Sequence, residues 1–380
     1  CNFTRGIRKE GIFMSEHNEH FHGSDLETVE RIYHLKKEEI VSFSSNVNPL
    51  GISQKLRETL AEHLDAIASY PDREYTKLRE CIASYIGSRP EHIIVGNGAT
   101  ELISLFIQTL RPKKALIPAP TYSEYEREIA LGGGAVLYYP LRERDEFRLE
   151  IEEFRGALND SIDLLVLCNP NNPTSSAISR SGLRRILDAC REHRIFVMID
   201  ETYVEFAPDE AAITAVPLTA EYENLILLRG TSKFFAAPGL RLGYAVTGNR
   251  NTVNAVNTRK NPWTINSLAE IAGRLMFTDK EYISRTKALI SSERTRMLNV
   301  LNSWDFVTCY PPSGNFILMR SLCERVTAGT LFDRCMKKGL MIRDCSSFPG
   351  LDNSYVRFCV MMPKDNDRLL QAMREVFSEA

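Results

Sequence analysis

The sequence predicts an α/β fold in which a large doubly wound domain with a mostly parallel sheet is followed by a smaller α+β domain. Three observations lead to this prediction: the length of 380 residues, a series of short apolar runs separated by amphipathic stretches, and a change of this rhythm after Asn249. A chain of roughly two to three times the usual domain length is expected to form two domains.

Six short apolar runs predict the strands of the large domain. Each is almost continuously apolar, as is typical of strands buried on both faces of a parallel sheet. The amphipathic stretches between them, such as 101–110 and 181–194, are long enough for crossover helices. This alternation is typical of a doubly wound domain. The runs cover residues 92–98, 114–120, 135–141, 163–170, 195–201 and 224–230.

The C-terminal part has a different pattern. A long helical region, 266–303, predicts two helices, and the chain beyond it predicts short strands mixed with helices. We expect a flexible or added leader at 1–20, a segment at 21–49 that joins the small domain, a large domain at 50–270 and a small domain at 271–380. The predicted strands lie near 306–309, 315–319, 340–343 and 355–360, and the helices at 327–337 and 363–377.

The composition excludes several classes of protein. The 47 basic and 49 acidic residues leave a formal charge of −2, which is too balanced for a nucleic-acid or anionic-membrane partner. No stretch reaches the roughly 20 apolar residues of a membrane span. The nine cysteines form no CxxC pair or Cys/His cluster, so we expect no metal site and reduced thiols in a cytoplasmic protein.

Polar residues follow the predicted strands, where ligands bind in open α/β sheets. Gly96-Asn97-Gly98-Ala99-Thr100 is a strand-to-helix turn with two glycines and a hydroxyl, which suits a phosphate at a helix N-terminus. An ordinary tight turn has the same composition, so the motif alone leaves both interpretations open.

Three further turns carry reactive side chains. The motif NPNNPT (169–174) is rich in amides, DETY (200–203) places two carboxylates after a strongly apolar strand, and TSK (231–233) places a lysine beside two hydroxyls. A buried carboxylate needs a cationic or N–H partner, and a buried lysine can act as a nucleophile or base. Taken singly, the asparagines are also common in turns and the lysine is also compatible with a solvated surface.

Taken together, these motifs resemble the fold-type I pyridoxal-phosphate enzymes, the aspartate aminotransferase superfamily. NPNNPT, DETY and TSKFFAAPGLRLGY (231–244) occur in order, and the resemblance extends from about His22 to the C-terminus. It implies pyridoxal phosphate as cofactor, which requires a lysine, a carboxylate for the pyridine nitrogen and donors for the phosphate. It also implies a homodimer with active sites at the subunit interface.

The resemblance assigns roles to individual residues. Lys233 would bond covalently to the cofactor, and Asp200 would pair with the pyridine nitrogen. Asn172 and Tyr203 would hold the ring oxygen, and Tyr122 would stack on the ring. The cofactor phosphate would be bound by Gly98, Ala99, Thr100, Ser232 and Arg241, and by Tyr75 from the neighbouring subunit.

Two positions depart from the family pattern. Gly230 stands three residues before the lysine, where the family usually has a serine or threonine for the phosphate, so Thr231 or Ser232 would have to substitute. Ser175 replaces the glycine of the usual Pro-Thr-Gly turn.

Within the superfamily the chain is most similar to threonine-phosphate decarboxylases of cobalamin biosynthesis, which are akin to histidinol-phosphate aminotransferases. The motifs that carry this similarity are FHGS (21–24), SSNVNPLG (44–51), ASYPDREY (68–75), NPWTINSLAEIAG (261–273) and IRDCSSFPGLDNSYVRFCV (342–360). The resemblance implies a small phosphorylated amino acid as substrate. It would be bound by Arg357 at its carboxylate, by Arg343 at a second anionic group, and by His22 and Asn48.

Three functions remain open at this point. The first is decarboxylation of L-threonine O-3-phosphate, or of a close analogue such as serine phosphate, to the phosphorylated amino alcohol. The second is transamination of histidinol phosphate or a phosphonate-bearing amino donor. The third is a non-catalytic relative, which the departures at Gly230 and Ser175 would allow. Lys233 abstracts a proton in transamination, whereas the carboxylate leaves in decarboxylation, and a small rotation of the substrate separates the two outcomes.

Overall fold

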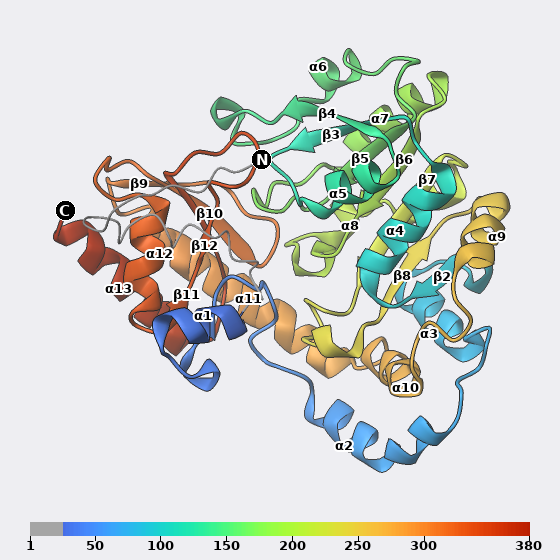
Figure 1. Ribbon diagram of the computed structural model, residues 1–380, viewed down its shortest axis with the longest axis horizontal. Helices are drawn as coiled ribbons and strands as arrows, with labels where there is room; N and C mark the ends of the chain where they lie inside the picture. The colour runs from blue at the N-terminus through green and yellow to red at the C-terminus, as the bar shows by residue number, and fades with distance from the viewer. Residues whose placement is uncertain (1–25) are drawn as a thin grey trace, which may run out of the picture.

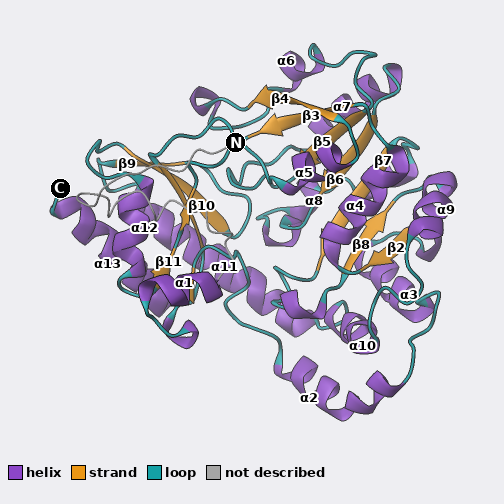
Figure 2. Cartoon of the chain, in the orientation of Figure 1, coloured by secondary structure: helices purple, strands orange, loops and turns teal. Residues whose placement is uncertain are grey.

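Residues 26–380 are described by the structure, a computed structural model, and they confirm the predicted α/β class. A seven-stranded sheet with helices packed around it forms the larger part of the molecule, and a four-stranded sheet with its own helices forms the smaller part (Figure 1). Figure 2 shows helices on both sides of the larger sheet. Within the described residues, no helix is both long and apolar enough to cross a membrane.

The seven-stranded sheet is mostly parallel and has the order β2-β8-β7-β6-β5-β3-β4. All six predicted runs form strands, and one strand that we did not predict, β8, lies antiparallel between β2 and β7. β8 is only four residues long and begins with glycine, so it gives no apolar run in the sequence. The strands are β2 (Ile93–Gly96), β3 (Lys114–Ala119), β4 (Ala135–Pro140), β5 (Leu164–Cys168), β6 (Phe196–Asp200), β7 (Leu225–Gly230) and β8 (Gly243–Val246).

Helices cover both faces of this sheet, as β5 illustrates. Leu164 and Val166 pack on one face, whereas Leu165 and Leu167 pack on the other, because side chains alternate along a strand. The first face is covered by α4 (Gly98–Leu110), α5 (Glu124–Leu131) and α9 (Arg250–Arg259), and the second by α3 (Thr76–Ile86), α6 (Ile151–Arg155) and α7 (Arg180–Glu192). The short helices α2 (Gln54–Glu62) and α8 (Glu210–Ile213) complete this part.

One strand differs from the expected burial. β4 was expected to be buried on both faces, but Leu137 is 41% exposed and Tyr138 is 38% exposed. The physical reason is its position, because β4 is at the end of the sheet and pairs with β3 on one side. The apolar composition therefore predicted correctly that these residues form a strand, but the prediction that the strand is buried on both faces was wrong.

The smaller sheet is antiparallel and has the order β12-β13-β10-β9. The predicted helical region 266–303 divides into α10 (Ser267–Met276) and α11 (Lys280–Leu301). Near the N-terminus, α1 (Leu26–Tyr33) leads to β1 (Val41–Ser42), which pairs in parallel with β11 (Leu340–Met341). The other elements are β9 (Val307–Cys309), β10 (Phe316–Ser321), α12 (Ala328–Met336), β12 (Arg343–Asp344), β13 (Tyr355–Cys359) and α13 (Pro363–Ser378).

The predicted domain boundary at residue 270 lies inside α10. Gly273 of this helix packs so closely on Leu78 and Leu242 that a Cβ atom there would come within 2.6 Å of both side chains. Because Leu78 lies on α3 and Leu242 precedes β8, α10 packs on the large domain.

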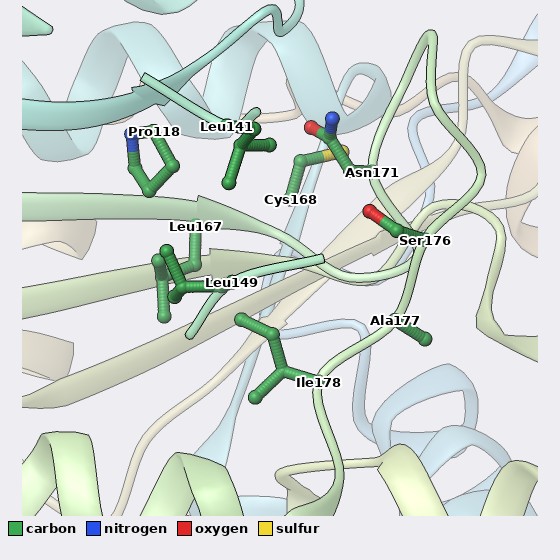
Figure 3. Close-up of a pocket in the computed structure, with 9 residues that line it drawn as sticks. All are labelled: Pro118, Leu141, Leu149, Leu167, Cys168, Asn171, Ser176, Ala177 and Ile178. Carbon is green, nitrogen blue, oxygen red and sulfur yellow. The ribbon is translucent and has the colours of Figure 1, made fainter. Parts of the chain in front are cut away.

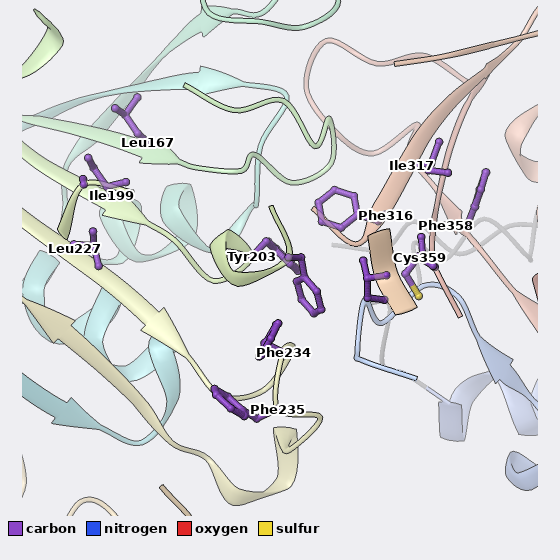
Figure 4. Packing of buried hydrophobic residues seen from close by; sticks show 14 of the residues in the cluster. Leu167, Ile199, Tyr203, Leu227, Phe234, Phe235, Phe316, Ile317, Phe358 and Cys359 are labelled. Atoms are coloured by element: carbon purple, nitrogen blue, oxygen red, sulfur yellow. The ribbon is translucent and has the colours of Figure 1, made fainter. Parts of the chain in front are cut away.

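Apolar side chains fill the space between the two sheets. Tyr203 and Phe234 lie between strand residues of the large sheet, such as Leu227, and Phe316 and Phe358 of the small sheet (Figure 4). The rings of Tyr203 and Phe316 meet edge to face, with centroids 4.9 Å apart. The two sheets thus share one continuous core.

Ser175 forms a polar connection between the same two parts. It is fully buried, its φ is +61°, and its hydroxyl accepts a hydrogen bond of 2.8 Å from the backbone N–H of Gly314. Its carbonyl accepts a second bond of 2.8 Å from the N–H of Ser313. The serine that departs from the family pattern therefore links the loop after β5 to the turn before β10.

We expect Ser175→Ala to lower the free energy of unfolding more than Ser175→Gly does. Both variants lose the hydroxyl and leave the buried Gly314 N–H unsatisfied, at a cost of about 1–3 kcal/mol. Glycine also removes the left-handed backbone strain, worth about 1–2 kcal/mol, which alanine retains. Urea denaturation of both variants measures the difference, and equal stabilities would contradict this account.

Candidate functional site

The ends of three parallel strands bring the predicted motifs together. β5 pairs with β6 so that Cys168 is opposite Asp200, and β6 pairs with β7 so that Asp200 is opposite Leu228. The turns NPNNPT, DETY and TSK follow these strand ends directly. They therefore meet at the carboxyl edge of the sheet, where ligands bind in folds of this type.

Asp200 is a buried carboxylate with several hydrogen-bond donors. Its side chain is 4% exposed, and its Oδ1 accepts bonds from the backbone N–H of Thr202 at 2.9 Å and from the Thr202 hydroxyl at 2.5 Å. Tyr125 donates its hydroxyl hydrogen to Oδ2 at 2.7 Å. Burial raises the pKa of Asp200, and these donors act in the opposite direction. A carboxylate in this position favours a positively charged partner.

Lys233 lies in a cationic and poorly solvated environment. Its Nζ donates a hydrogen bond of 2.5 Å to the carbonyl of Ser45. Burial and, to a smaller extent, the nearby positive charge of Arg357 together lower the pKa of this amine to about 8. A larger fraction of the amine is therefore neutral and nucleophilic near neutral pH than for an exposed lysine.

Asn172 and Tyr203 lie beside the same edge and contact residues from other parts of the chain. The Oδ1 atom of Asn172 accepts a hydrogen bond from Arg357, which leaves its amide N–H groups as donors. The hydroxyl of Tyr203 accepts a bond of 3.3 Å from Nδ2 of Asn46, and burial raises the pKa of Tyr203 to about 12. Both side chains can thus donate to an oxygen atom at neutral pH.

The N-terminus of α4 forms a narrow cradle. Gly98 begins the helix with φ +81°, and a Cβ atom at this position would collide with the guanidinium of Arg241. A Cβ at Gly243 of β8 would lie 2.5 Å from the backbone nitrogen of Ala99. Glycines at these positions allow β8 and Arg241 to approach the helix end. Ala99 and the exposed Thr100 follow Gly98 in the first turn, where free N–H groups favour an anion.

Ser232 is better suited than Thr231 to replace the hydroxyl that is missing at Gly230. Thr231 is fully buried and its hydroxyl donates to the carbonyl of Leu242 at 3.0 Å, so its hydrogen is already used. Ser232 is half-buried and precedes Lys233. Gly230 itself lies beside the cradle, because a Cβ there would be 3.6 Å from Cβ of Ala99.

Tyr122 lies next to the buried carboxylate network. Its half-buried ring meets the ring of Tyr125 edge to face, with centroids 5.5 Å apart and an interplanar angle of 84°. Tyr125 in turn binds Asp200. The contact between these rings is compatible with the predicted stacking of Tyr122 on the face of a flat ring whose edge meets Asp200.

The prediction for Tyr75 is wrong. This side chain is 1% exposed within its own chain, and its hydroxyl donates to the carbonyl of Ile265 and accepts from the N–H of the same residue, both at 3.0 Å. It therefore cannot extend into a neighbouring subunit. The exposed tyrosine of the motif is Tyr70, which is 79% exposed and stacks near Trp263 with ring centroids 4.7 Å apart.

The prediction that Asn48 binds substrate is also wrong. Its Nδ2 donates to the Phe234 carbonyl and to the hydroxyls of Tyr282 and Thr286 at 2.8–2.9 Å, and its Oδ1 accepts from the N–H of Leu50. The side chain is 2% exposed. Its amide nitrogen therefore holds the N-terminal segment against α11 and the turn after Lys233, while its oxygen closes a local turn. His22 lies outside the described residues.

Arg343 and Arg357 lie directly opposite each other on β12 and β13. Arg357 is buried, and its Nη2 donates to the Ser44 carbonyl at 2.7 Å, while its Nε is buried without a partner. Arg343 is half-buried and its Nη2 donates to the Ser347 hydroxyl at 3.1 Å. Like charges in directly opposite positions repel, so this pair favours an anion.

Three contacts were not predicted from the sequence. They are the Ser45 carbonyl at Lys233, the Asn46 amide at Tyr203 and the Tyr125 hydroxyl at Asp200. Asn46 and Ser45 belong to the SSNVNPLG motif, and Tyr125 lies three residues after Tyr122 in the segment PTYSEY (120–125). These segments of the sequence therefore indicated which parts of the chain lie at the site. The spacing of their residues did not indicate which side chains face it.

A small cavity lies behind the NPNNPT loop. It has a volume of about 20 Å³, enough for one water molecule, and leucine, isoleucine, alanine and proline side chains form most of its wall (Figure 3). Cys168, Asn171 and Ser176 contribute its polar atoms. This volume is far too small for a cofactor.

Comparison with known proteins identifies the family. The family described as aminotransferase class I and II matches residues 38–373. A protein of Caldanaerobacter subterraneus subsp. tengcongensis, provisionally named threonine-phosphate decarboxylase, is 38% identical over 88% of this chain and 90% of its own length. The threonine-phosphate decarboxylase of Salmonella typhimurium is 32% identical over 94% of this chain and 96% of its own length.

A solved structure also resembles this chain along most of its length. Histidinol-phosphate aminotransferase from Clostridium acetobutylicum superimposes with a TM-score of 0.83 at 33% identity, over 89% of this chain and 99% of its own. The side chains described above fit the cofactor of these enzymes: a lysine with a lowered pKa, a buried carboxylate and a glycine-lined helix end beside an arginine. The chain therefore belongs to the class I and II aminotransferase family and is an enzyme whose cofactor is pyridoxal phosphate.

Proposed function

We propose that the enzyme decarboxylates an O-phosphorylated amino acid, L-threonine O-3-phosphate or a close analogue such as serine phosphate, to the phosphorylated amino alcohol. The observation that carries this proposal is the pair Arg343 and Arg357, which lie opposite each other on β12 and β13, with the charge of Arg357 near Lys233. A substrate with two anionic groups offers each guanidinium a partner. The names of the two decarboxylase relatives support the same substrate class.

Apart from Tyr75, we assign the cofactor residues the roles that the resemblance implies. Lys233 bonds to the cofactor, Asp200 pairs with the pyridine nitrogen, and Asn172 and Tyr203 donate to the ring oxygen. Tyr122 stacks on the ring, while the phosphate is bound by Gly98, Ala99, Thr100, Ser232 and Arg241. Support comes from the buried carboxylate, the free amide donor of Asn172 and the glycine cradle beside Arg241.

When bound, pyridoxal phosphate withdraws electrons from a bond at the substrate α-carbon. Arg357 binds the substrate carboxylate and thereby selects the bond between Cα and this group. The electrons of this bond stay on Cα when the carboxylate leaves as carbon dioxide. Lys233 then delivers the proton that takes its place at Cα. Arg343 binds the phosphate and fixes the rotation of the substrate, on which the choice of bond depends.

Transamination is the second candidate function. The similarity to the Clostridium acetobutylicum histidinol-phosphate aminotransferase favours it. In this case Lys233 would remove the proton from Cα instead of returning one, and the donor would be histidinol phosphate or a phosphonate-bearing amine. The two functions use the same side chains in different orders.

We also propose a homodimer with the active sites at the interface. Leu64, Ile67, Tyr70 and Trp263 are all exposed apolar side chains, at 54%, 70%, 79% and 41%. This group adjoins the phosphate cradle, because Thr264 donates a 2.5 Å bond to Glu101 in the first turn of α4. A second copy that covers these residues would lie beside the cofactor phosphate.

Incubation with L-threonine O-3-phosphate should release carbon dioxide, as measured by capture of labelled carbon dioxide from the 1-¹⁴C substrate. Lys233→Ala should abolish the release of carbon dioxide. The variant has no amine that bonds to the cofactor and gives way to the substrate amine, and none that delivers the proton to Cα. The proposal fails if no carbon dioxide appears while histidinol phosphate with 2-oxoglutarate supports turnover.

Arg343→Ala should raise the KM for threonine phosphate about 10- to 100-fold, because it removes a charge-assisted hydrogen bond to the phosphate. It should also lower kcat for decarboxylation, because the rotation of the bound substrate is no longer fixed. The dissociation constant of the cofactor should not change. Arg343→Lys retains the charge without the guanidinium fork and should recover part of the affinity. An unchanged KM for Arg343→Ala would exclude this residue from phosphate binding.

Capture of pyridoxal phosphate by the apoenzyme should accelerate with rising pH, with a midpoint at about pH 8, and level off above it. Only the neutral amine can bond to the cofactor, and the pKa of Lys233 is lowered from 10.5 to about 8. Arg357→Gln should move this midpoint to higher pH, because the Arg357 charge contributes to the lowering. Stopped-flow absorbance measures the rates, and the same series with free lysine corrects for titration of the cofactor. A wild-type midpoint near 10.5 would contradict the prediction.

A further inference from the structure

A buried hydrogen bond connects α5 to the carboxylate at the end of β6. Tyr125, in the first turn of α5, donates its hydroxyl hydrogen to Oδ2 of Asp200 at 2.7 Å. The exposed fractions are 1% for Tyr125 and 4% for Asp200. A buried hydrogen bond to an ionised group is strong, because water does not compete for either partner.

The two oxygens of Asp200 are supported from different parts of the chain. Both bonds to Oδ1 come from Thr202, which is two residues away and belongs to the same turn. The bond to Oδ2 comes from a helix that is 75 residues away in the sequence. Tyr125 therefore fixes the rotation of the carboxylate relative to the rest of the large domain, which the local turn cannot do.

The phenol of Tyr125 keeps its hydrogen at neutral pH and is therefore a donor to Asp200. Burial raises its pKa well above the ordinary value, and the negative charge of Asp200 raises it further. The same ring supports Tyr122 by edge-to-face packing. One side chain thus contacts both the carboxylate proposed to pair with the ring nitrogen and the aromatic residue proposed to stack on the ring face.

We propose that Tyr125 is a positioning residue for the cofactor ring: it keeps Asp200 ionised and aimed at the pyridine nitrogen, so that this nitrogen stays protonated, and it orients Tyr122 for stacking on the ring face. The proposal rests on the roles of Asp200 and Tyr122 in the proposed function. Tyr125 itself touches neither the reacting atoms nor the substrate.

The test uses the holoenzyme loaded with pyridoxal phosphate labelled with ¹⁵N in the ring. The ¹⁵N chemical shift reports protonation of the ring nitrogen directly and is titrated between pH 5 and pH 10. Tyr125→Phe should lower the titration midpoint of the nitrogen by about one pH unit and weaken cofactor binding about tenfold, since a hydrogen bond to a charged group is lost. Cofactor fluorescence measures the dissociation constant.

Tyr222→Phe is a matched control. Tyr222 is also a buried tyrosine that donates to a carboxylate, Asp188 of α7, at 2.8 Å. Its variant should leave the ¹⁵N titration and the cofactor dissociation constant unchanged, whatever its effect on stability. A general loss of packing is thereby separated from an effect on the ring nitrogen.

A second substitution keeps the test valid if Tyr125→Phe does not fold. Incorporation of 3-fluorotyrosine at position 125 preserves the ring and the hydroxyl but makes the hydroxyl a stronger donor, so the nitrogen midpoint should move upward. Midpoints and affinities equal to wild type in the available variants would overturn the proposal for Tyr125. A ring nitrogen that is unprotonated in wild type would instead overturn the role of Asp200, and with it the proposed function of that residue.

Discussion

Parallel pairing of β5, β6 and β7 is the constraint on which the rest of the site depends. The register places the ends of the three strands at one edge of the sheet, so that each of the following turns contributes a different group. β5 leads to the amide of Asn172, β6 ends in the carboxylate of Asp200, and β7 leads to the amine of Lys233. A parallel sheet requires crossover helices, and these helices in turn supply Tyr125 and the cradle at Gly98.

The N-terminal segment between β1 and α2 joins the two parts of the molecule at this edge. Its backbone carbonyls at Ser44 and Ser45 accept hydrogen bonds from Arg357 and Lys233, and its Asn46 amide reaches Tyr203. Carbonyl oxygens satisfy the two cations partly, without neutralising them. The site therefore retains positive charge for anionic ligands although the whole chain has a formal charge of −2.

A second set of buried charges lies behind the site and has a structural role. Arg229 of β7 is 1% exposed and donates two hydrogen bonds, at 2.8 and 3.1 Å, to Oε2 of Glu201. Glu201 follows Asp200 in sequence, and adjacent residues of an extended chain point in opposite directions. Two adjacent carboxylates thus have separate partners: a fixed arginine for Glu201, and the proposed cofactor nitrogen together with Tyr125 and Thr202 for Asp200.

The sequence by itself determined the strands, the order of the motifs and the chemical identity of the main site residues. Apolar runs and strand-end motifs such as DETY are local signals. A strand that is buried on both faces requires a short run of apolar residues, and a site residue at its end follows that run directly in the sequence. Only the tertiary structure decided which members of a motif face the site. Tyr75 and Asn48 are turned into the core, whereas Asn46 and Tyr125 reach Tyr203 and Asp200. The physical reason is that hydrogen bonds over more than 70 residues depend on the packing of helices and sheets, which no local pattern in the sequence encodes.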